Sequence, residues 1–562
     1  MRGDMGLIYK TLESCQRSMY LYFPPIPKHS PYKRCSVTIL SDQVDKAAVE
    51  RMIEENGLGE MARERQLILA FPDPGPEGWD PGRDMEVIEQ LQGAMTTERE
   101  LEPVQTYFGI PTLESMLASW HLMNDTRYLI GIGEKGAAMA LAMAACRPMN
   151  VAAVMTIGGS LPEVGEDKAV YSPVPVWLCG ADAQTVSYFI SANGARKESE
   201  TRWACPGRPL QSVELHPEAE LTPVFLNRVW EELFQKVRRT NTGRCGNVAH
   251  RTDIGKYGGE YFIEDTRLGD QDNMPHTWLT FVPECVRNLP EGEKAPLLIF
   301  YHGGSDNPTE AAEMARFHEI GDREGFITVY PWGSNRCSWN IFMNEDEMDD
   351  VAFSEALIRY MTAHYPVDPS RVYLSGFSNG SSQAMVTAMV HPELVAAICP
   401  IDGNWPGERI GPSEVDYEQI KPMALARRIQ EKKDYRMPVW YTYGTREPSY
   451  PVYRGCTQQH QYDFWKRYNH IPVKETPEDG HEEPSGVGVC GDKTEILHSP
   501  ADCAEHWYSI HRFYSDDPEP MNLYNYVMMH DKGHEVAELD PCLGWEYVKH
   551  FRRKQDGSLE LI

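Results

Sequence analysis

An internal repeat is the feature that most constrains the fold of this chain. Segments of the first half recur in the same order in the second half, and each pair shares an apolar pattern and several identical residues. The pairs are SVTIL (36–40) with PLLIFY (296–301), LILAFPD (67–73) with FITVYPW (326–332), NDTRYLIGIGEKG (124–136) with DPSRVYLSGFSNG (368–380), VPVWLCGAD (174–182) with MPVWYTYGTRE (437–447), and HPEAELTP (216–223) with HEVAELDP (534–541). Conserved order together with shared identity predicts a tandem duplication.

Each copy alternates short apolar strands with amphipathic helices, which predicts a mostly parallel sheet with helices on both faces. A chain of 562 residues is also too long for a single core. We expect a first domain over 1–237, a polar, glycine-containing linker over 238–260 and a second domain over 261–562. Within the second domain, 404–436 and 470–520 are expected to be lid-like insertions at the ligand-binding edge of the sheet.

Charge and cysteine usage exclude several classes of function. The chain has 83 acidic and 54 basic side chains, for a net charge of −29. Such a chain repels nucleic acid and anionic membrane surfaces, so neither is an expected partner. Its 13 cysteines include no C-x-x-C pair and show no zinc or redox spacing. No metal and no organic cofactor is expected. The sequence has neither a signal-peptide pattern nor an apolar run of membrane-spanning length, which favours a cytoplasmic protein.

The second half contains a candidate nucleophile at Ser378. It stands in Gly376-Phe377-Ser378-Asn379-Gly380, between an apolar strand and a helix rich in small residues. The G-x-S-x-G spacing is typical of a sharp strand-to-helix turn that holds a serine hydroxyl outward. A serine hydroxyl is a weak nucleophile, so it requires a general base, a group that orients the base, and N–H donors for the oxyanion.

Candidates for the base and the acid follow in the chain order Ser, acid, His that this type of turn predicts. Glu447 follows the strand VWYTYGT, and Asp402, at the end of the preceding strand, is its rival. His534 follows the strand NYVMM and precedes the last helix, and His530 is its rival. We expect His534 to accept the proton of Ser378 and Glu447 to orient the imidazole.

Two further groups of residues are expected around the nucleophile. The backbone N–H groups of Gly304 and Asn379 are predicted to form the oxyanion hole, because Gly304 follows an early strand in a glycine turn and Asn379 follows the nucleophile. Loops at the same edge of the sheet contribute the candidate pocket residues His302, Gly303, Trp332, Trp339 and Trp405.

These motifs together resemble the poly(3-hydroxybutyrate) depolymerase and feruloyl-esterase-like group of α/β hydrolases. The resemblance rests on His302-Gly303-Gly304, on DDVAF (349–353), on DPSRVY (368–373) and on the G-x-S-x-G turn. Members of the group usually carry the acid as G-T-x-D-P, whereas this chain reads Gly444-Thr445-Arg446-Glu447-Pro448. The family histidine follows a glycine, which matches Gly533-His534.

The resemblance implies two tandem α/β-hydrolase-type domains and a serine carboxylic-ester hydrolase that acts through an acyl-enzyme. Its substrate would be a small or oligomeric ester, either aromatic of the feruloyl type or a hydroxyalkanoate. A peptidase or amidase of the same fold is the alternative enzyme, and a non-catalytic binding scaffold is the alternative outside enzymology.

The first copy lacks the groups that this chemistry needs. Its nucleophile position reads Gly133, and the His-Gly-Gly turn is replaced by Ser41-Asp42-Gln43. Asp182 and His216 stand near the expected acid and base positions. We therefore expect the first domain to be a degenerate, non-catalytic hydrolase copy, and a surface for homo-oligomer formation is one role open to it.

Overall fold

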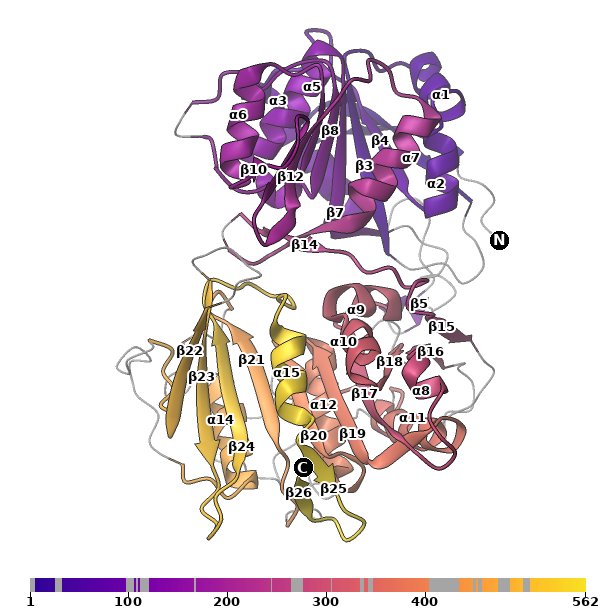
Figure 1. Cartoon of the computed structure of the whole chain (residues 1–562). Helices are drawn as coiled ribbons and strands as arrows, with labels where there is room; N and C mark the ends of the chain where they lie inside the picture. Colours follow the sequence, from indigo (N-terminus) through magenta and orange to yellow (C-terminus); the bar gives the residue numbers. More distant parts are fainter. Residues whose placement is uncertain are drawn as a thin grey trace. The chain divides into compact units, whose positions relative to one another are not determined.

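The computed structural model divides the chain into two compact units, Met1–Arg251 and Thr252–Ile562. The structure describes residues 6–25, 33–97, 106–107, 110–111, 121–165, 168–243, 245–263, 276–304, 306–333, 338–341, 347–403, 434–447, 451–452, 457–473, 486–498 and 506–562. Each unit is built around a large, mostly parallel sheet (Figure 1).

The sheet of the first unit has ten strands with a parallel centre and antiparallel edges. In spatial order they are β1 (Gly6–Leu12), β2 (Arg17–Phe23), β4 (Ile68–Pro72), β3 (Lys33–Ser41), β7 (His121–Ile132), β8 (Ala153–Ile157), β9 (Val176–Cys179), β12 (Arg208–His216), β11 (Arg202–Cys205) and β10 (Arg196–Lys197). One apolar core involves α1 (Lys46–Glu54), α2 (Leu58–Arg65) and α7 (Pro223–Glu232), and the other involves α3 (Pro81–Thr97), α5 (Gly133–Cys146) and α6 (Ala183–Ala192).

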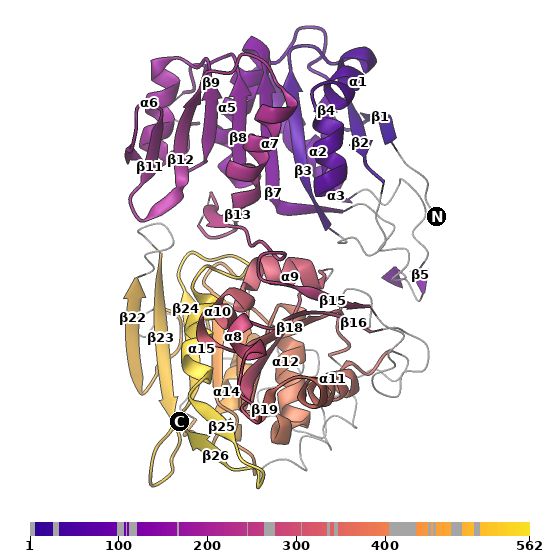
Figure 2. The same cartoon turned by 45° about the vertical axis from the view of Figure 1, so that its right-hand side comes forward.

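The sheet of the second unit also has ten strands with the same arrangement. In spatial order they are β15 (Glu260–Ile263), β16 (Thr277–Phe281), β18 (Ile327–Pro331), β17 (Ala295–Tyr301), β19 (Val367–Phe377), β20 (Ala397–Ile401), β21 (Val439–Gly444), β24 (Asn522–Met529), β23 (Trp507–Tyr514) and β22 (Lys493–His498). Its helices are α8 (Glu284–Arg287), α9 (Pro308–Ala315), α10 (Phe317–Glu324), α11 (Asp350–His364), α12 (Asn379–Val390), α14 (Thr457–Tyr468) and α15 (Asp540–Val548), and Figure 2 shows α10 and α15 on the face opposite α11 and α12.

The two sheets have the same strand order and the same sense of pairing at every step. Their register matches as well, because Leu40 pairs with Gly131 in the first unit as Tyr301 pairs with Gly376 in the second. Positions in the two units can therefore be matched strand by strand. A buried sheet with helices on both faces explains the near-continuous apolar runs in strands such as β8 and β20.

The predicted linker over 238–260 differs from what the structure contains. Strands β13 (Val237–Thr240) and β14 (Asn247–His250) form an antiparallel pair that packs with the first unit. The Arg239 guanidinium is buried and donates to the backbone carbonyls of Pro173 and Cys245. The stretch reads as polar because its polar side chains satisfy buried backbone groups, and the boundary lies after Arg251.

One of the two predicted insertions also needs correction. Most of 404–436 lies outside the described residues. The second insertion, 470–520, contains the whole of β22 and β23, which extend the sheet beyond β24 instead of covering it. Their counterparts in the first unit are the shorter strands β10 and β11.

Smaller elements complete the described chain. They are the pairs β5 (Thr106–Tyr107) with β6 (Ile110–Pro111) and β25 (Phe551–Arg553) with β26 (Leu559–Leu561), and 3-10 turns at Pro148–Asn150, Phe234–Lys236 and Pro392–Leu394. Within the described ranges, no helix combines the length and the hydropathy needed to span a lipid bilayer.

Candidate active site

Ser378 lies at a sharp turn between strand β19 and helix α12. Its backbone has φ 54° and ψ −120°, a conformation that side-chain-bearing residues rarely adopt. The flanking glycines make the turn possible: a Cβ at Gly376 would lie 2.3 Å from the Gly380 carbonyl oxygen, and one at Gly380 would lie 2.2 Å from the Tyr301 carbonyl oxygen. The G-x-S-x-G spacing is therefore a steric requirement of this turn, and Ser378 remains partly exposed at its apex.

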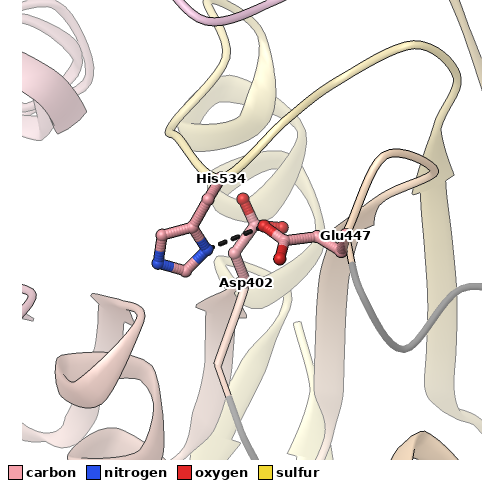
Figure 3. A group of neighbouring side chains, drawn as sticks. All are labelled: Asp402, Glu447 and His534. Carbon is pink, nitrogen blue, oxygen red and sulfur yellow. Dashed lines mark hydrogen bonds and ion pairs between the residues drawn. The ribbon is translucent and has the colours of Figure 1, made fainter.

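Glu447 and His534 form a hydrogen-bonded pair next to this turn (Figure 3). Glu447 follows β21, His534 follows β24, and the distance from His534 Nδ1 to Glu447 Oε1 is 2.7 Å. The imidazole packs against the ring of Phe377, the residue before Ser378, with ring centroids 4.7 Å apart. Because the carboxylate accepts at Nδ1, the neutral imidazole carries its proton there and leaves Nε2 as the basic atom.

The surroundings of His534 shift its pKa in opposite directions. Burial lowers the pKa, but the hydrogen bond to Glu447 and the negative charges of Asp402 and Glu447 raise it by more, while Lys532 opposes them. The pKa of His534 therefore lies above the ordinary value for histidine. The His534 side chain remains 48% exposed, whereas Glu447 is buried, so the imidazole is accessible to solvent and the carboxylate is shielded from it.

Asp402, the rival acid, has a different partner. Its Oδ2 lies 3.0 Å from Lys532 Nζ and accepts from the Glu535 N–H at 3.2 Å. Donor atoms of Asp402, Glu447 and His534 lie within 4.8 Å of one another, so the three residues have the donor set of a metal site (Figure 3). The Lys532 ammonium already supplies a positive charge to Asp402, which weakens the case for a metal ion there.

His530, the rival base, lies beside the outer strands of the sheet. Its ring stacks on Trp507, with centroids 3.3 Å apart, and its Nε2 lies 3.2 Å from Ser509 Oγ. Both contacts are made to β23. The geometry around Glu447 and Phe377 therefore favours His534 over His530.

The two predicted oxyanion-hole positions lie close together. A Cβ built on Gly304 would be 4.0 Å from Asn379 Cβ. Gly304 is exposed, and Asn379 is the first residue of α12, where backbone N–H groups lack intrahelical acceptors. The Asn379 side chain is held separately, because its Oδ1 accepts from the Trp339 N–H at 2.6 Å and from Ser338 Oγ at 3.0 Å.

The predicted pocket residues that the structure describes are buried. His302 is fully buried: Nε2 accepts from the Gly333 N–H at 2.9 Å, and its carbonyl accepts from Trp339 Nε1 at 2.8 Å. Trp339 and Trp332 are buried, and Gly303 packs tightly against Phe377. The His302 and Trp339 side chains therefore hold neighbouring loop segments together instead of facing solvent, and Trp405 lies outside the described residues.

The first unit keeps the backbone of the turn but not its chemistry. Gly133, which occupies the position of Ser378 after the matched strand, has φ 86°. The Asp42 carboxylate accepts from the N–H groups of Glu134, Lys135 and Gly136 at 3.0, 3.0 and 2.6 Å. A Cβ at Gly133 would lie 2.5 Å from Asp42 Oδ2. An acidic side chain therefore covers the N–H donors at the start of α5, which sequence reasoning did not identify.

The other two positions expected in the first unit have different roles. The Asp182 carboxylate caps α6 by accepting from the Thr185 N–H at 2.8 Å. His216 ends strand β12 opposite Cys179, and its ring lies against Trp177, with centroids 4.0 Å apart. The expectation that His216 matches His534 is wrong in register, because His534 lies beyond the end of its strand.

Comparison with known proteins bears on the second unit. Residues 286–416 match the family model described as Esterase PHB depolymerase. Poly(3-hydroxyalkanoate) depolymerase C from Paucimonas lemoignei is 29% identical over 130 residues, which cover 22% of this chain and 31% of that protein. An acetylxylan esterase from Coprinopsis cinerea is 27% identical over 167 residues, covering 28% and 42%. Feruloyl esterase B from Piromyces equi is 31% identical over 115 residues, covering 19% and 21%.

These matches are partial on both sides, because the chain spans less than half of the length of each of these relatives. Among solved structures, an acetyl xylan esterase from Aspergillus awamori matches 52% of this chain and 99% of its own, with a TM-score of 0.36 and 14% identity. The match of residues 286–416 includes the Ser378 turn and the three strands before it, β17, β18 and β19. Residues 286–416 of the second unit are therefore similar to the PHB depolymerase esterase family, and they lie within an α/β fold.

Proposed function

We propose that the second unit is a serine carboxylic-ester hydrolase that acts through an acyl-enzyme. One observation carries this proposal: the strained Ser378 turn lies beside a His534 imidazole that is hydrogen-bonded to Glu447 and packed on Phe377. A scaffold protein has no physical need for a strained serine, an accessible base and a buried orienting acid at one edge of a sheet.

In the acylation step, the Ser378 hydroxyl attacks the ester carbonyl carbon and passes its proton to Nε2 of His534. Glu447 holds the imidazole by its Nδ1 proton and stabilises the imidazolium that forms. The N–H groups of Gly304 and Asn379 are assigned to the oxygen that becomes negatively charged. The imidazolium then gives its proton to the departing alcohol, which leaves the acyl group on Ser378.

Deacylation repeats these proton transfers with water. His534 Nε2 takes a proton from the attacking water, the tetrahedral intermediate places its charge on the same N–H groups, and the acid product leaves as Ser378 regains its proton. The raised pKa of His534 makes the imidazole a stronger base. Activity should be lost as the pH falls through this pKa, which lies above the ordinary value for histidine.

The relatives' names suggest the class of substrate. They are named as a poly(3-hydroxyalkanoate) depolymerase, an acetylxylan esterase and a feruloyl esterase. We extend this class to the present chain as small or oligomeric esters, either aromatic or of the hydroxyalkanoate type. The net charge of −29 favours neutral over anionic substrates.

The first unit is proposed to be a non-catalytic copy of the same fold. The matching strand order and register of the two sheets support a duplication. Gly133 has no nucleophile, and the Asp42 carboxylate occupies the N–H groups that an oxyanion would need. Loss of the serine and neutralisation of the donors are separate changes, so restoring one does not restore the other.

We predict that Gly133→Ser will not create a second active site. Introduced into a Ser378→Ala background, it is expected to give no ester turnover and no labelled peptide containing residue 133. It is also expected to lower the stability of the first unit by about 1–3 kcal/mol, because a side chain is forced to positive φ and against Asp42. Thermal unfolding and peptide mapping check both effects, and a labelled residue 133 contradicts the assignment.

The proposed function is tested by labelling the full chain with a fluorophosphonate probe and mapping the modified peptide. The expected result is a single stoichiometric modification at Ser378, blocked by prior incubation with a substrate ester. A panel of p-nitrophenyl acetate, p-nitrophenyl butyrate, methyl ferulate, a hydroxybutyrate oligomer and a matched anilide then separates esterase from amidase. If the chain is not labelled and turns over none of the esters, the proposal is contradicted and a binding scaffold is favoured. Preferential cleavage of the anilide favours the amidase.

A further inference from the structure

A buried cluster of charges lies directly behind His534. Lys532 Nζ lies 3.0 Å from Asp402 Oδ2 and 2.7 Å from Asp540 Oδ2, and all three side chains are fully buried. Asp540 is itself held by the Tyr508 hydroxyl at 3.0 Å and by the Ala537 N–H at 2.9 Å. Buried charges need partners of opposite sign, so these groups depend on one another.

The cluster is tied to the His534 loop at several points. Asp402 pairs with the Lys532 side chain, which precedes His534 in the sequence, and accepts from the N–H of Glu535, which follows it. The Lys532 carbonyl accepts from the N–H of Arg446, the residue before Glu447, at 3.0 Å. Lys532 therefore contacts the strand end that carries Asp402 and the loop that carries Glu447.

Two carboxylates thus converge on one imidazole. Donor atoms of Asp402, Glu447 and His534 lie within 4.8 Å of one another, but a hydrogen bond joins only Glu447 to His534 among these three described residues. Burial raises the pKa of the Asp402 carboxyl, and the positive charge of Lys532 opposes that rise. Without Lys532, Asp402 would face His534 either as an uncompensated charge or as a protonated acid.

We propose that Lys532 is a positioning residue that engages Asp402, so that Glu447 alone orients His534. The inference rests on the proposed function, because it concerns the base of the same site. Lys532 touches no reacting atom, and it acts by pairing with one of two competing carboxylates and by holding the loop on either side of Gly533-His534.

The charges around His534 make this proposal measurable. The charged groups that act on it are Asp402 at the end of β20, Glu447 after β21 and Lys532 on its own loop, and Lys532 is also paired with Asp540 of α15. The negative charge of Asp402 raises the pKa of His534, and the positive charge of Lys532 lowers it. Removing the Lys532 charge should therefore raise the pKa of His534, and removing the Asp402 charge should lower it.

The experiment compares Lys532→Met, Asp402→Asn and the double variant in the full chain. The acidic limb of the kcat/KM profile is expected to move to higher pH by on the order of one pH unit in Lys532→Met and to lower pH in Asp402→Asn. In the double variant it should return toward the wild-type position. If Lys532 were purely structural, the variants would lose activity, but the acidic limb would not shift in opposite directions and would not return in the double variant.

Two controls keep the result interpretable. Lys466→Met removes another buried lysine, on α14 between the rings of Tyr462 and Phe513, and should leave the limb in place. Titration of the His534 imidazole by NMR reports the same shifts without turnover, so the inference can fail or hold independently of the ester hydrolase proposal. If Lys532→Met does not fold, Asp402→Asn decides: a limb and an imidazole titration that stay at the wild-type pH overturn the proposal.

Discussion

Ser378→Ala is expected to lower kcat for ester hydrolysis by about 10⁴–10⁶-fold, because it removes the only atom proposed to form the acyl-enzyme. Residual turnover above the uncatalysed rate should remain, because the oxyanion donors and substrate binding are untouched. KM should change little, since the hydroxyl contributes mainly to the reacting geometry. Steady-state kinetics on the best ester of the panel, with burst-phase analysis of the wild type, measures all three quantities.

Ser375→Ala is the matched control for this variant. Ser375 lies three residues earlier in β19, and its buried hydroxyl donates to the Cys399 carbonyl at 2.6 Å. Its loss is expected to cost about 1 kcal/mol of stability and less than tenfold in kcat. Ser378→Ala should keep the wild-type melting temperature, because alanine and serine face the same backbone strain at φ 54°. Equal losses of activity in the two variants contradict the assignment of Ser378.

Glu447→Gln is expected to lower kcat by about 10⁴-fold with little change in fold. A glutamine amide can donate to Nδ1 of His534, which places the imidazole in the wrong tautomer, and a neutral group cannot stabilise the imidazolium. Loss of the carboxylate also lowers the pKa of His534, since Glu447 raises it by its hydrogen bond and its charge. The acidic limb of the residual activity should therefore move to lower pH, which a pH–rate profile measures.

Asp402→Asn is the comparison that decides between the two acids. It removes a buried carboxylate that is bound to Lys532 and Glu535, and its amide oxygen can still accept from the Glu535 N–H. We expect a loss of activity far smaller than that of Glu447→Gln. A larger loss in Asp402→Asn would assign the orienting role to Asp402 and contradict the hydrogen-bond geometry at His534.

Much of the fold was predictable from the sequence because parallel strands buried on both faces leave strong local patterns. The apolar runs of β8 and β20, and the glycines around Ser378, follow from burial and from close backbone approach at single positions. The exceptions are segments whose environment is not local. The stretch 238–260 looks like a linker although β13 and β14 pack on the first unit, and 470–520 looks like an insertion although β22 and β23 extend the sheet.

For the candidate site, the sequence by itself determined the turn that holds Ser378, the order of serine, acid and histidine, and the absence of a nucleophile at Gly133. These properties depend on residue type and on short-range sterics. Only the tertiary structure decided that Glu447 rather than Asp402 forms the hydrogen bond to His534. It also decided that His302 and Trp339 are buried, and that Asp42 covers the backbone N–H donors of the first unit. Lys532 carried no sequence signal, because its role arises when three strand ends meet and two carboxylates compete for one imidazole.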